Sequence, residues 1–126
     1  MTQSEQRPSV WVGHIVLNVG DVAASKAFFV KLGMRDVEPQ ASVGILELRG
    51  GTHLVILPTD HPAAEDAQAS FDLMVEDIEV THASYLEMGI DPSPMTSNKI
   101  HTSFEIREPG GHRITVNSTH VSDHPV

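Results

Sequence analysis

The sequence of 126 residues contains no cysteine, which excludes disulfide bonds, thiolate metal ligands and a cysteine nucleophile. Aromatic residues make up only 5% of the chain, with a single tryptophan, so the signal for a binding site that grips planar molecules between rings is weak. No apolar run approaches the roughly 20 residues that a membrane-spanning helix needs. We therefore expect no membrane span and no disulfide-stabilised fold.

Positive charge is also scarce, since 8 Lys and Arg residues face 17 Asp and Glu residues, for a formal net charge of -9. Such an acidic surface repels phosphate backbones, so we expect no nucleic-acid partner. The polar residues 1–8 lack the apolar stretch of a signal peptide, which predicts a cytoplasmic protein. A small-molecule ligand remains open, because a local pocket can carry a charge opposite to that of the whole surface.

An internal repeat is the most informative feature of the sequence. In a gap-free alignment, equivalent positions carry the same residue at Leu17 and Leu73, Val19 and Val75, Asp21 and Asp77, Ala27 and Ala83, and Gly33 and Gly89. Each copy ends in a Gly-Gly hairpin, and a half of roughly 60 residues is too small to bury a core easily. We expect one domain, residues 1–126, with module one at about 10–58, a linker at about 59–68 and module two at about 69–118.

Each module has the pattern of a strand, a helix and three further positions for strands. Asp21 and Asp77 are placed to cap the two helices. A stripe of Ala24, Ala27, Phe28 and Leu32 predicts the core-facing side of the first helix. Strands are expected at 11–19, near 35–38, and at 42–48, 53–57, 70–75, 102–107 and 112–117, with a proline-broken stretch at 91–94. The predicted fold class is α+β, with two tandem βαβββ modules forming a curved mixed sheet around a cavity.

Three segments, residues 13–19, 28–34 and 107–114, resemble the vicinal oxygen chelate superfamily of glyoxalases, bleomycin-resistance proteins and extradiol dioxygenases. The last segment is similar to the family's strand–Asp-Pro-Asp-Gly–strand signature, with Glu108 and Gly110 in place of its two Asp residues. The resemblance covers roughly residues 10–118. It implies the paired modules, a small-molecule ligand and a homodimer whose cavities combine module one of one subunit with module two of the other.

The same resemblance implies a divalent metal held by one His, Glu or Gln on the first and last strand of each module. These positions fall on His14, on Ile56 (or Val55, if the hairpin shifts by one residue), on Ser70 and on Thr115. Only His14 is a good ligand, whereas a stable site needs about three protein ligands. We therefore expect no cofactor, and a divalent metal only as the less favoured alternative.

Strand alternation predicts which side chains face the cavity. The ligand-binding candidates are His14, Asn18, Glu47, Ile56, Ser70, Asp72, Glu105, Arg113 and Thr115, and Arg107 shares their face. Asp72 and Glu105 are the candidates for a catalytic carboxylate. Two other interpretations remain open, namely ligand contacts without catalysis, and surface charges that pair with each other, such as Asp72 with Arg113.

The other histidines carry weaker signals, because His53 has core-facing parity, His61 lies in the linker, His82 is on an exposed helix face and His112 is at a hairpin. Two functions stay open. One is a small-molecule-binding protein of the glyoxalase/bleomycin-resistance type with a degraded metal site. The alternative is a glyoxalase-like metal-dependent lyase, isomerase or dioxygenase with atypical ligands centred on His14. The sequence leaves open whether the protein is an enzyme.

Overall fold

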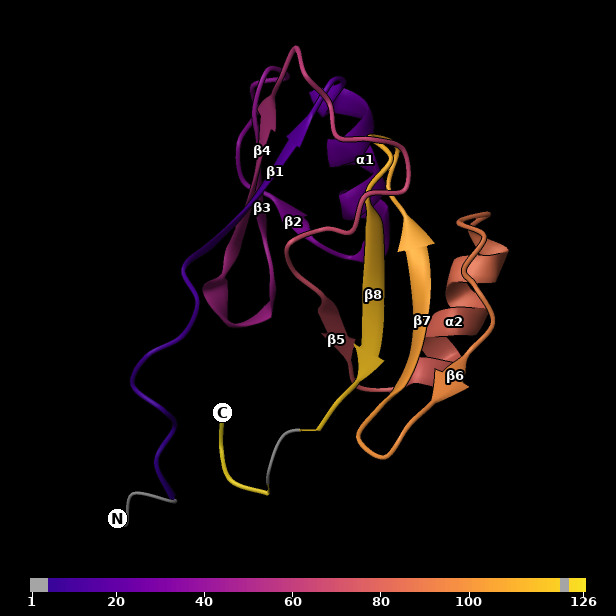
Figure 1. Ribbon diagram of the computed structural model, residues 1–126. Coiled ribbons are helices and arrows are strands. Elements are labelled where there is room, and N and C mark those ends of the chain that lie inside the picture. The colour runs from indigo at the N-terminus through magenta and orange to yellow at the C-terminus, as the bar shows by residue number, and fades with distance from the viewer. Residues whose placement is uncertain (1–4, 121–122) are drawn as a thin grey trace.

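The computed structural model describes residues 5–120 and 123–126 and contains two four-stranded sheets, each accompanied by one helix (Figure 1). Module one comprises β1 (His14–Val19), α1 (Val22–Leu32), β2 (Arg35–Asp36), β3 (Gly44–Glu47), a 3₁₀ turn (Arg49–Gly51) and β4 (His53–Pro58). Module two comprises β5 (Leu73–Val75), α2 (Ile78–Glu87), β6 (Thr96–Ser97), β7 (Thr102–Arg107) and β8 (Arg113–Ser118). The predicted α+β class is confirmed.

The two sheets share one topology, which is the structural counterpart of the sequence repeat. Their strand orders are β1-β4-β3-β2 and β5-β8-β7-β6. In each sheet the first strand pairs in parallel with the last strand, and the remaining pairs are antiparallel. The sequence predicted one curved sheet, whereas within one chain the strands form two separate sheets.

Both helices begin at the predicted aspartates. The Asp21 carboxylate accepts a hydrogen bond from the Ala24 N–H at 3.1 Å, and Asp77 accepts one from the Val80 N–H at 3.0 Å. These bonds satisfy N–H groups that lack a partner in the first helical turn. Helix α1 ends at Gly33, whose φ of 117° is accessible to glycine at little cost. The caps therefore fix the same helix in each copy of the repeat.

The buried face of α1 differs from the predicted stripe. Val22, Ser25, Lys26 and Phe29 are buried, whereas Ala27 is exposed. The Lys26 ammonium donates to the Glu38 carbonyl at 2.5 Å and to the Gln40 carbonyl at 3.0 Å, so this buried cation has hydrogen-bond partners. The predicted stripe holds for Phe28 and Leu32, which are partly buried against the core, and is wrong for Ala27. It missed Ser25 and Lys26 because hydrophobicity alone does not identify polar residues on the core-facing side.

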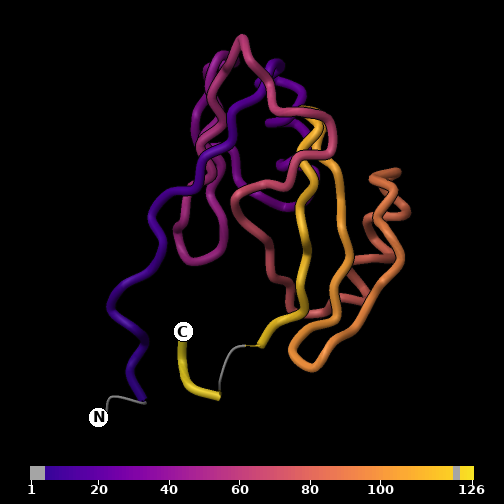
Figure 2. Tube along the Cα trace, in the orientation of Figure 1, coloured from indigo at the N-terminus to yellow at the C-terminus, as the bar shows by residue number. Residues whose placement is uncertain are grey.

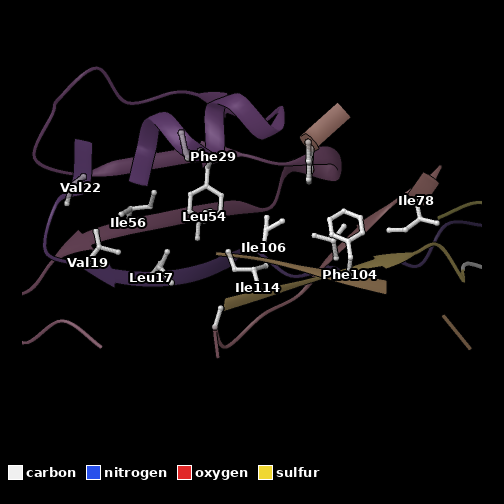
Figure 3. Close-up of a cluster of buried hydrophobic side chains, with 14 residues drawn as sticks. Leu17, Val19, Val22, Phe29, Leu54, Ile56, Ile78, Phe104, Ile106 and Ile114 are labelled. Carbon is white, nitrogen blue, oxygen red and sulfur yellow. The ribbon is translucent and has the colours of Figure 1, made fainter. Parts of the chain in front are cut away.

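One hydrophobic core runs through both modules (Figure 3). Phe29 of α1 lies over Leu54, and the layer continues through Ile106 and Ile114 toward Phe104 of module two. All five side chains are almost fully buried. The two modules therefore share one cluster of buried hydrophobic residues.

Two strands of module two differ from the sequence prediction. Strand β5 begins at Leu73 rather than Ser70, because the preceding backbone bonds to β8 as an isolated bridge between Gln68 and Arg113. The proline-broken stretch gives no strand, and β6 follows it at Thr96–Ser97.

Residues 5–13 extend away from the two sheets (Figure 2). This segment carries three consecutive exposed apolar side chains, Val10, Trp11 and Val12. The segment is attached at its inner end, where the Thr52 hydroxyl donates to the Val12 carbonyl at 2.6 Å. None of the helices in the described residues has the length and apolar character to cross a membrane.

Candidate functional site

The outward-facing side of each sheet carries the side chains that alternation predicted. On β1, His14, Val16 and Asn18 are exposed while Leu17 and Val19 are buried. Ser70, Asp72 and Met74 are likewise exposed ahead of and within β5, and Glu105 and Thr115 are half-buried on β7 and β8. We call these two surfaces the open faces of module one and module two.

On strand β4, the residues that face the core and those that face outward are the reverse of the main prediction. Ile56 is fully buried in the core, so the expectation that it faces the cavity is wrong. Its neighbour Val55 pairs with Val16 in the parallel register and therefore shares the open face. The last-strand position of module one is thus Val55, which was the stated alternative. A one-residue shift of a strand moves every side chain to the other face.

The same shift brings His53 onto the open face of module one, where the sequence did not place it. His53 pairs with His14 across the strands, with ring centroids 6.0 Å apart. Its Nε2 lies 3.2 Å from the Glu47 Oε2, and Arg35 donates to Glu47 Oε1 at 2.9 Å. These four side chains form a polar row across β1, β4, β3 and β2.

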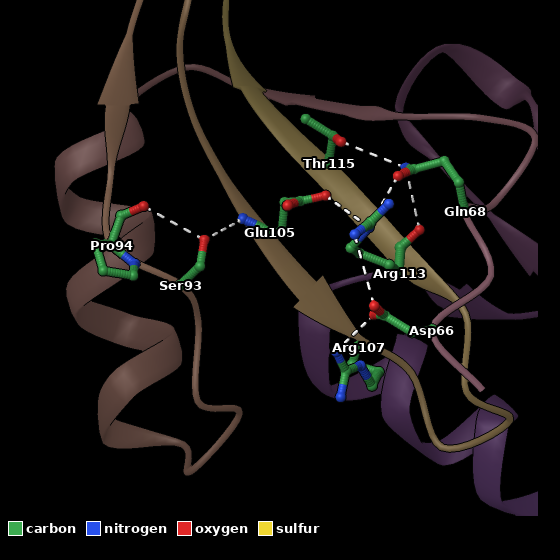
Figure 4. A network of polar contacts seen from close by, with 8 residues as sticks. All are labelled: Asp66, Gln68, Ser93, Pro94, Glu105, Arg107, Arg113 and Thr115. Carbon is green, nitrogen blue, oxygen red and sulfur yellow. Dashed lines mark hydrogen bonds and ion pairs between the residues drawn. The ribbon is translucent and has the colours of Figure 1, made fainter.

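On the open face of module two, the candidate residues bind one another (Figure 4). Arg113 Nε lies 3.0 Å from Glu105 Oε2 and donates to Gln68 Oε1 at 3.0 Å. Asp66 accepts from Arg107 at 2.6 Å and lies 3.6 Å from Arg113. The linker residues 66 and 68 thus contribute to the network, and its charges are largely balanced.

Asp72 has a different partner from the one suggested by the sequence. Its carboxylate accepts from the Asn117 amide at 3.0 Å, and Asn117 accepts from the Ser103 hydroxyl at 2.6 Å. Arg113 pairs with Glu105 and Asp66 instead. The predicted polar cavity is therefore divided into separate groups, one on module one and two on module two.

Two pockets lie beside these groups. A pocket of about 580 Å³ is lined by residues of both modules, including Met34, Leu48, Asp72, Met74 and Tyr85. Burial raises the pKa of the Tyr85 hydroxyl in its wall. A smaller pocket of about 350 Å³ lies between β1 and the linker. Its lining is Val16, Leu17, Asn18, His61, Ala63, Ala67, Gln68, Ser70 and His112. We call this second one the linker pocket.

A buried carboxylate joins the two modules next to the linker pocket. Glu108 accepts from the Ser25 hydroxyl of α1 at 2.7 Å, from the Gly110 N–H at 2.7 Å and from the His112 N–H at 3.1 Å, and the His112 Nδ1 lies 2.9 Å away. Burial raises the pKa of the Glu108 carboxyl, but the hydrogen bonds from His112, Ser25 and Gly110 lower it more, so this pKa lies below its ordinary value.

Glycine at position 110 is required by this close packing. A Cβ there would lie 2.6 Å from the Glu108 Oε2 and 2.8 Å from the Val19 side chain. Neither the importance of Ser25 nor that of His112 was evident from the sequence. The only signal was an acid directly before the Pro-Gly-Gly turn.

The side chains at the family's four metal positions can be compared with the ligands that a divalent metal ion needs. The four positions on the open faces are His14, Val55, Ser70 and Thr115. Val55 has no donor atom, and neutral hydroxyls of Ser and Thr are poor ligands compared with imidazole and carboxylate. The residues present therefore do not fit the family's metal. In the described part of the chain, no group of three or more His, Asp or Glu side chains is arranged to hold a metal ion.

Comparisons with known proteins point to one superfamily. The family model described as Glyoxalase/Bleomycin resistance protein/Dioxygenase superfamily matches residues 11–116. Lactoylglutathione lyase from Agrobacterium tumefaciens is similar in structure, with a TM-score of 0.71, 17% identity and coverage of 90% of this chain and 96% of that one. No curated protein matches the sequence.

Two further solved structures have the same fold. A glyoxalase/bleomycin resistance protein from Catenulispora acidiphila has a TM-score of 0.68 at 20% identity and covers 87% of this chain and 100% of its own. An integron cassette protein from the mobile metagenome of a Halifax Harbour sewage outfall has a TM-score of 0.73 at 15% identity, covering 86% of this chain and 98% of its own. At these identities the likeness concerns the fold alone.

Proposed function

Because the chain belongs to the glyoxalase/bleomycin resistance protein/dioxygenase superfamily, we propose that it binds a small molecule and does so without the family's metal centre. The observation that carries this proposal is the set of residues at the four metal positions, where only His14 has a suitable donor. A fold kept over residues 11–116 while its metal ligands are replaced favours a binding role of the bleomycin-resistance type.

The proposed binder is a homodimer. Its support is the apolar surface that one chain leaves exposed, including Val16 and Leu57 on the open face of module one and Met74 on that of module two. Val10 and Trp11 of the N-terminal segment add to this surface. Apolar side chains on a sheet face are stabilised when another surface covers them. Sedimentation equilibrium should give twice the chain mass, and a monomer at all concentrations would contradict this part of the proposal. The cytoplasmic location stays a prediction.

Native mass spectrometry of the purified protein tests the binding role. We expect an organic molecule that remains bound after dialysis against EDTA and is released on denaturation. Spectra recorded under denaturing conditions serve as the control, because a covalent modification would survive them. Binding that disappears with EDTA and returns with added metal would contradict the proposal.

The second candidate is a glyoxalase-like lyase, isomerase or dioxygenase centred on His14. The observation that favours it is the polar row on module one, in which His53 lies beside His14 and close to the Glu47 carboxylate. A carboxylate that orients an imidazole is a frequent arrangement for acid–base catalysis.

Substitution of this row tests the second candidate. An enzyme of this kind should lose most of its turnover in His53→Ala, and turnover in Glu47→Gln should fall with a changed pH profile. His82→Ala is the matched control, because His82 lies on α2 and contacts Phe104 and the Ser93 carbonyl instead. Equal turnover in His53→Ala and His82→Ala would exclude a catalytic role for the row.

A further inference from the structure

The Glu108–His112 pair lies outside the family's metal positions. Its hydrogen bonds determine which nitrogen of the His112 ring carries a proton. The Glu108 carboxylate can only accept hydrogen bonds when ionised, and two backbone N–H groups and the Ser25 hydroxyl already donate to it. His112 Nδ1, 2.9 Å from this carboxylate, must therefore carry a proton. In the neutral ring the other nitrogen, Nε2, is then an acceptor.

The Nε2 of His112 is open to a ligand. No partner for it exists among the described residues, and no buried side-chain nitrogen or oxygen in that part of the chain lacks a hydrogen bond. Nε2 therefore reaches the surface, although the side chain as a whole is only 10% exposed. His112 belongs to the wall of the linker pocket, so the pocket is where a ligand would meet this nitrogen.

The lining of the linker pocket indicates which ligands it suits. The chain has a net charge of -9, but no Lys, Arg, Asp or Glu residue lines this pocket. Val16, Ala63 and Ala67 provide apolar surface, and Asn18 and Ser70 provide groups that hydrogen-bond. A neutral, partly apolar molecule is compatible with such a lining, whereas a phosphate would meet no Lys or Arg and a polycation no Asp or Glu.

We propose that the linker pocket binds a neutral molecule with an aromatic or aliphatic body and a hydroxyl group, and that this hydroxyl donates to His112 Nε2. Glu108 acts as a positioning residue, since it fixes the proton on Nδ1 and keeps Nε2 free to accept. The inference rests on the proposed small-molecule binding and names the ligand class and the pocket.

The probes that test this are 2-naphthol and its methyl ether, 2-methoxynaphthalene. Like the tyrosine hydroxyl, the naphthol hydroxyl stays protonated at neutral pH, and the ether has nearly the same body without a donor. By titration calorimetry or fluorescence, the wild-type protein should bind naphthol roughly tenfold more tightly than the ether, the size of one net hydrogen bond.

The variant that isolates Nε2 is His112→Asn. The Asn amide N–H can replace Nδ1–H as a donor to Glu108, so the buried carboxylate keeps its partner while the Nε2 atom is removed. The preference for naphthol over the ether should fall to about onefold in this variant. His120→Asn is the matched control, because His120 is exposed and does not line the pocket. Thermal unfolding of both variants checks that the fold is kept.

The tautomer of His112 gives a second measurement that needs no ligand. Long-range ¹⁵N–¹H NMR spectra should show the neutral ring protonated at Nδ1, and a ring protonated at Nε2 would overturn the inference. It would also be overturned if neither probe binds, or if His112→Asn keeps the naphthol preference. If the co-purified molecule binds His112→Asn as well as wild type, the proposed binding function holds and this inference fails. If EDTA-treated protein binds no small molecule, the proposed function itself fails.

Discussion

The two helices of the repeat occupy equivalent places in the sequence and very different places in the structure. Helix α1 buries Val22, Ser25, Lys26 and Phe29, whereas α2 buries only Ile78 and Tyr85. The alignment that places Leu17 on Leu73 also places Phe29 on Tyr85 and Ser25 on Thr81. Ser25 donates to Glu108 of the other module, but Thr81 donates to the Asp77 carbonyl of its own helix.

The difference shows that duplication of a sequence does not duplicate its packing. Helix α1 lies where the two modules meet, so its inner face must satisfy a buried carboxylate as well as the core. Helix α2 packs on the sheet of its own module and leaves large apolar side chains such as Val80 and Leu86 exposed. The interface between the modules is therefore asymmetric. Paired substitutions at equivalent positions of the two modules measure this asymmetry as a difference in the free energy of unfolding.

The largest effect is expected for Phe29→Ala. Phe29 is fully buried in the core that both modules share, so its loss should lower the free energy of unfolding by about 4 kcal/mol. The equivalent Tyr85→Ala should cost about 2 kcal/mol, since Tyr85 packs mainly within module two against Phe104. Urea denaturation measures both. Equal losses would show that α1 is no more central than α2.

Glu108→Ala should rank next, with a loss of about 3 kcal/mol, because it leaves several buried donors without an acceptor. When the Gly-Gly hairpins are aligned, Leu48 is the equivalent residue of module one, and it is only partly buried. Leu48→Ala should cost about 1 kcal/mol. Chemical denaturation of both variants measures the two losses of stability. A smaller loss for Glu108→Ala than for Leu48→Ala would contradict the role of the Glu108 carboxylate in holding the modules together.

Low pH should weaken the contact that Glu108 makes between the two modules. The pKa of Glu108 is lower in the folded state than its ordinary value, so the folded state binds this proton less readily than the unfolded state. Its contribution is present above the unfolded pKa and is lost as the pH falls below about 5 and through the lower folded value. The denaturation midpoint followed against pH should fall less steeply in Glu108→Gln than in wild type. Glu87→Gln is the control, because Glu87 is exposed on α2, and it should keep the wild-type slope.

The smallest effect on stability is expected for the two equivalent helix hydroxyls, those of Ser25 and Thr81. Ser25→Ala removes one donor from a buried carboxylate and should cost about 1.5 kcal/mol. Thr81→Ala removes a bond within one helix and should cost less than about 0.5 kcal/mol. Thermal unfolding of the two variants gives the comparison. A reversed order would place the asymmetry somewhere other than the Ser25–Glu108 contact.

Much of the fold was predictable from local patterns. The repeat, the two aspartate caps and the alternation along β1 depend on residues that are close in sequence, and the structure agrees with each of them. The start of β4 was predicted at His53, but its inward and outward faces were not, because residues 54–57 are all apolar and show no alternation. One error in parity accounts for both misplaced residues, Ile56 in the core and His53 on the open face.

The candidate site was predictable only in part for a similar reason. Alternation predicts that His14, Asp72 and Glu105 lie on open faces, but it does not predict their partners. Asp72, for example, accepts a hydrogen bond from Asn117 on β8, which is distant in the sequence. The Ser25–Glu108 bond joins residues far apart in sequence, and no local pattern announces it. Whether any candidate residue touches a ligand stays a prediction.

The metal content of the purified protein tests the central claim most directly. Zinc, nickel and iron should be measured by inductively coupled plasma mass spectrometry in wild type and in His14→Ala, after the proteins are exposed to these metals and then desalted. A binder without the family's metal centre predicts far less than one metal ion per chain and no difference between the two proteins. One equivalent of metal per chain in wild type, lost in His14→Ala, would contradict it.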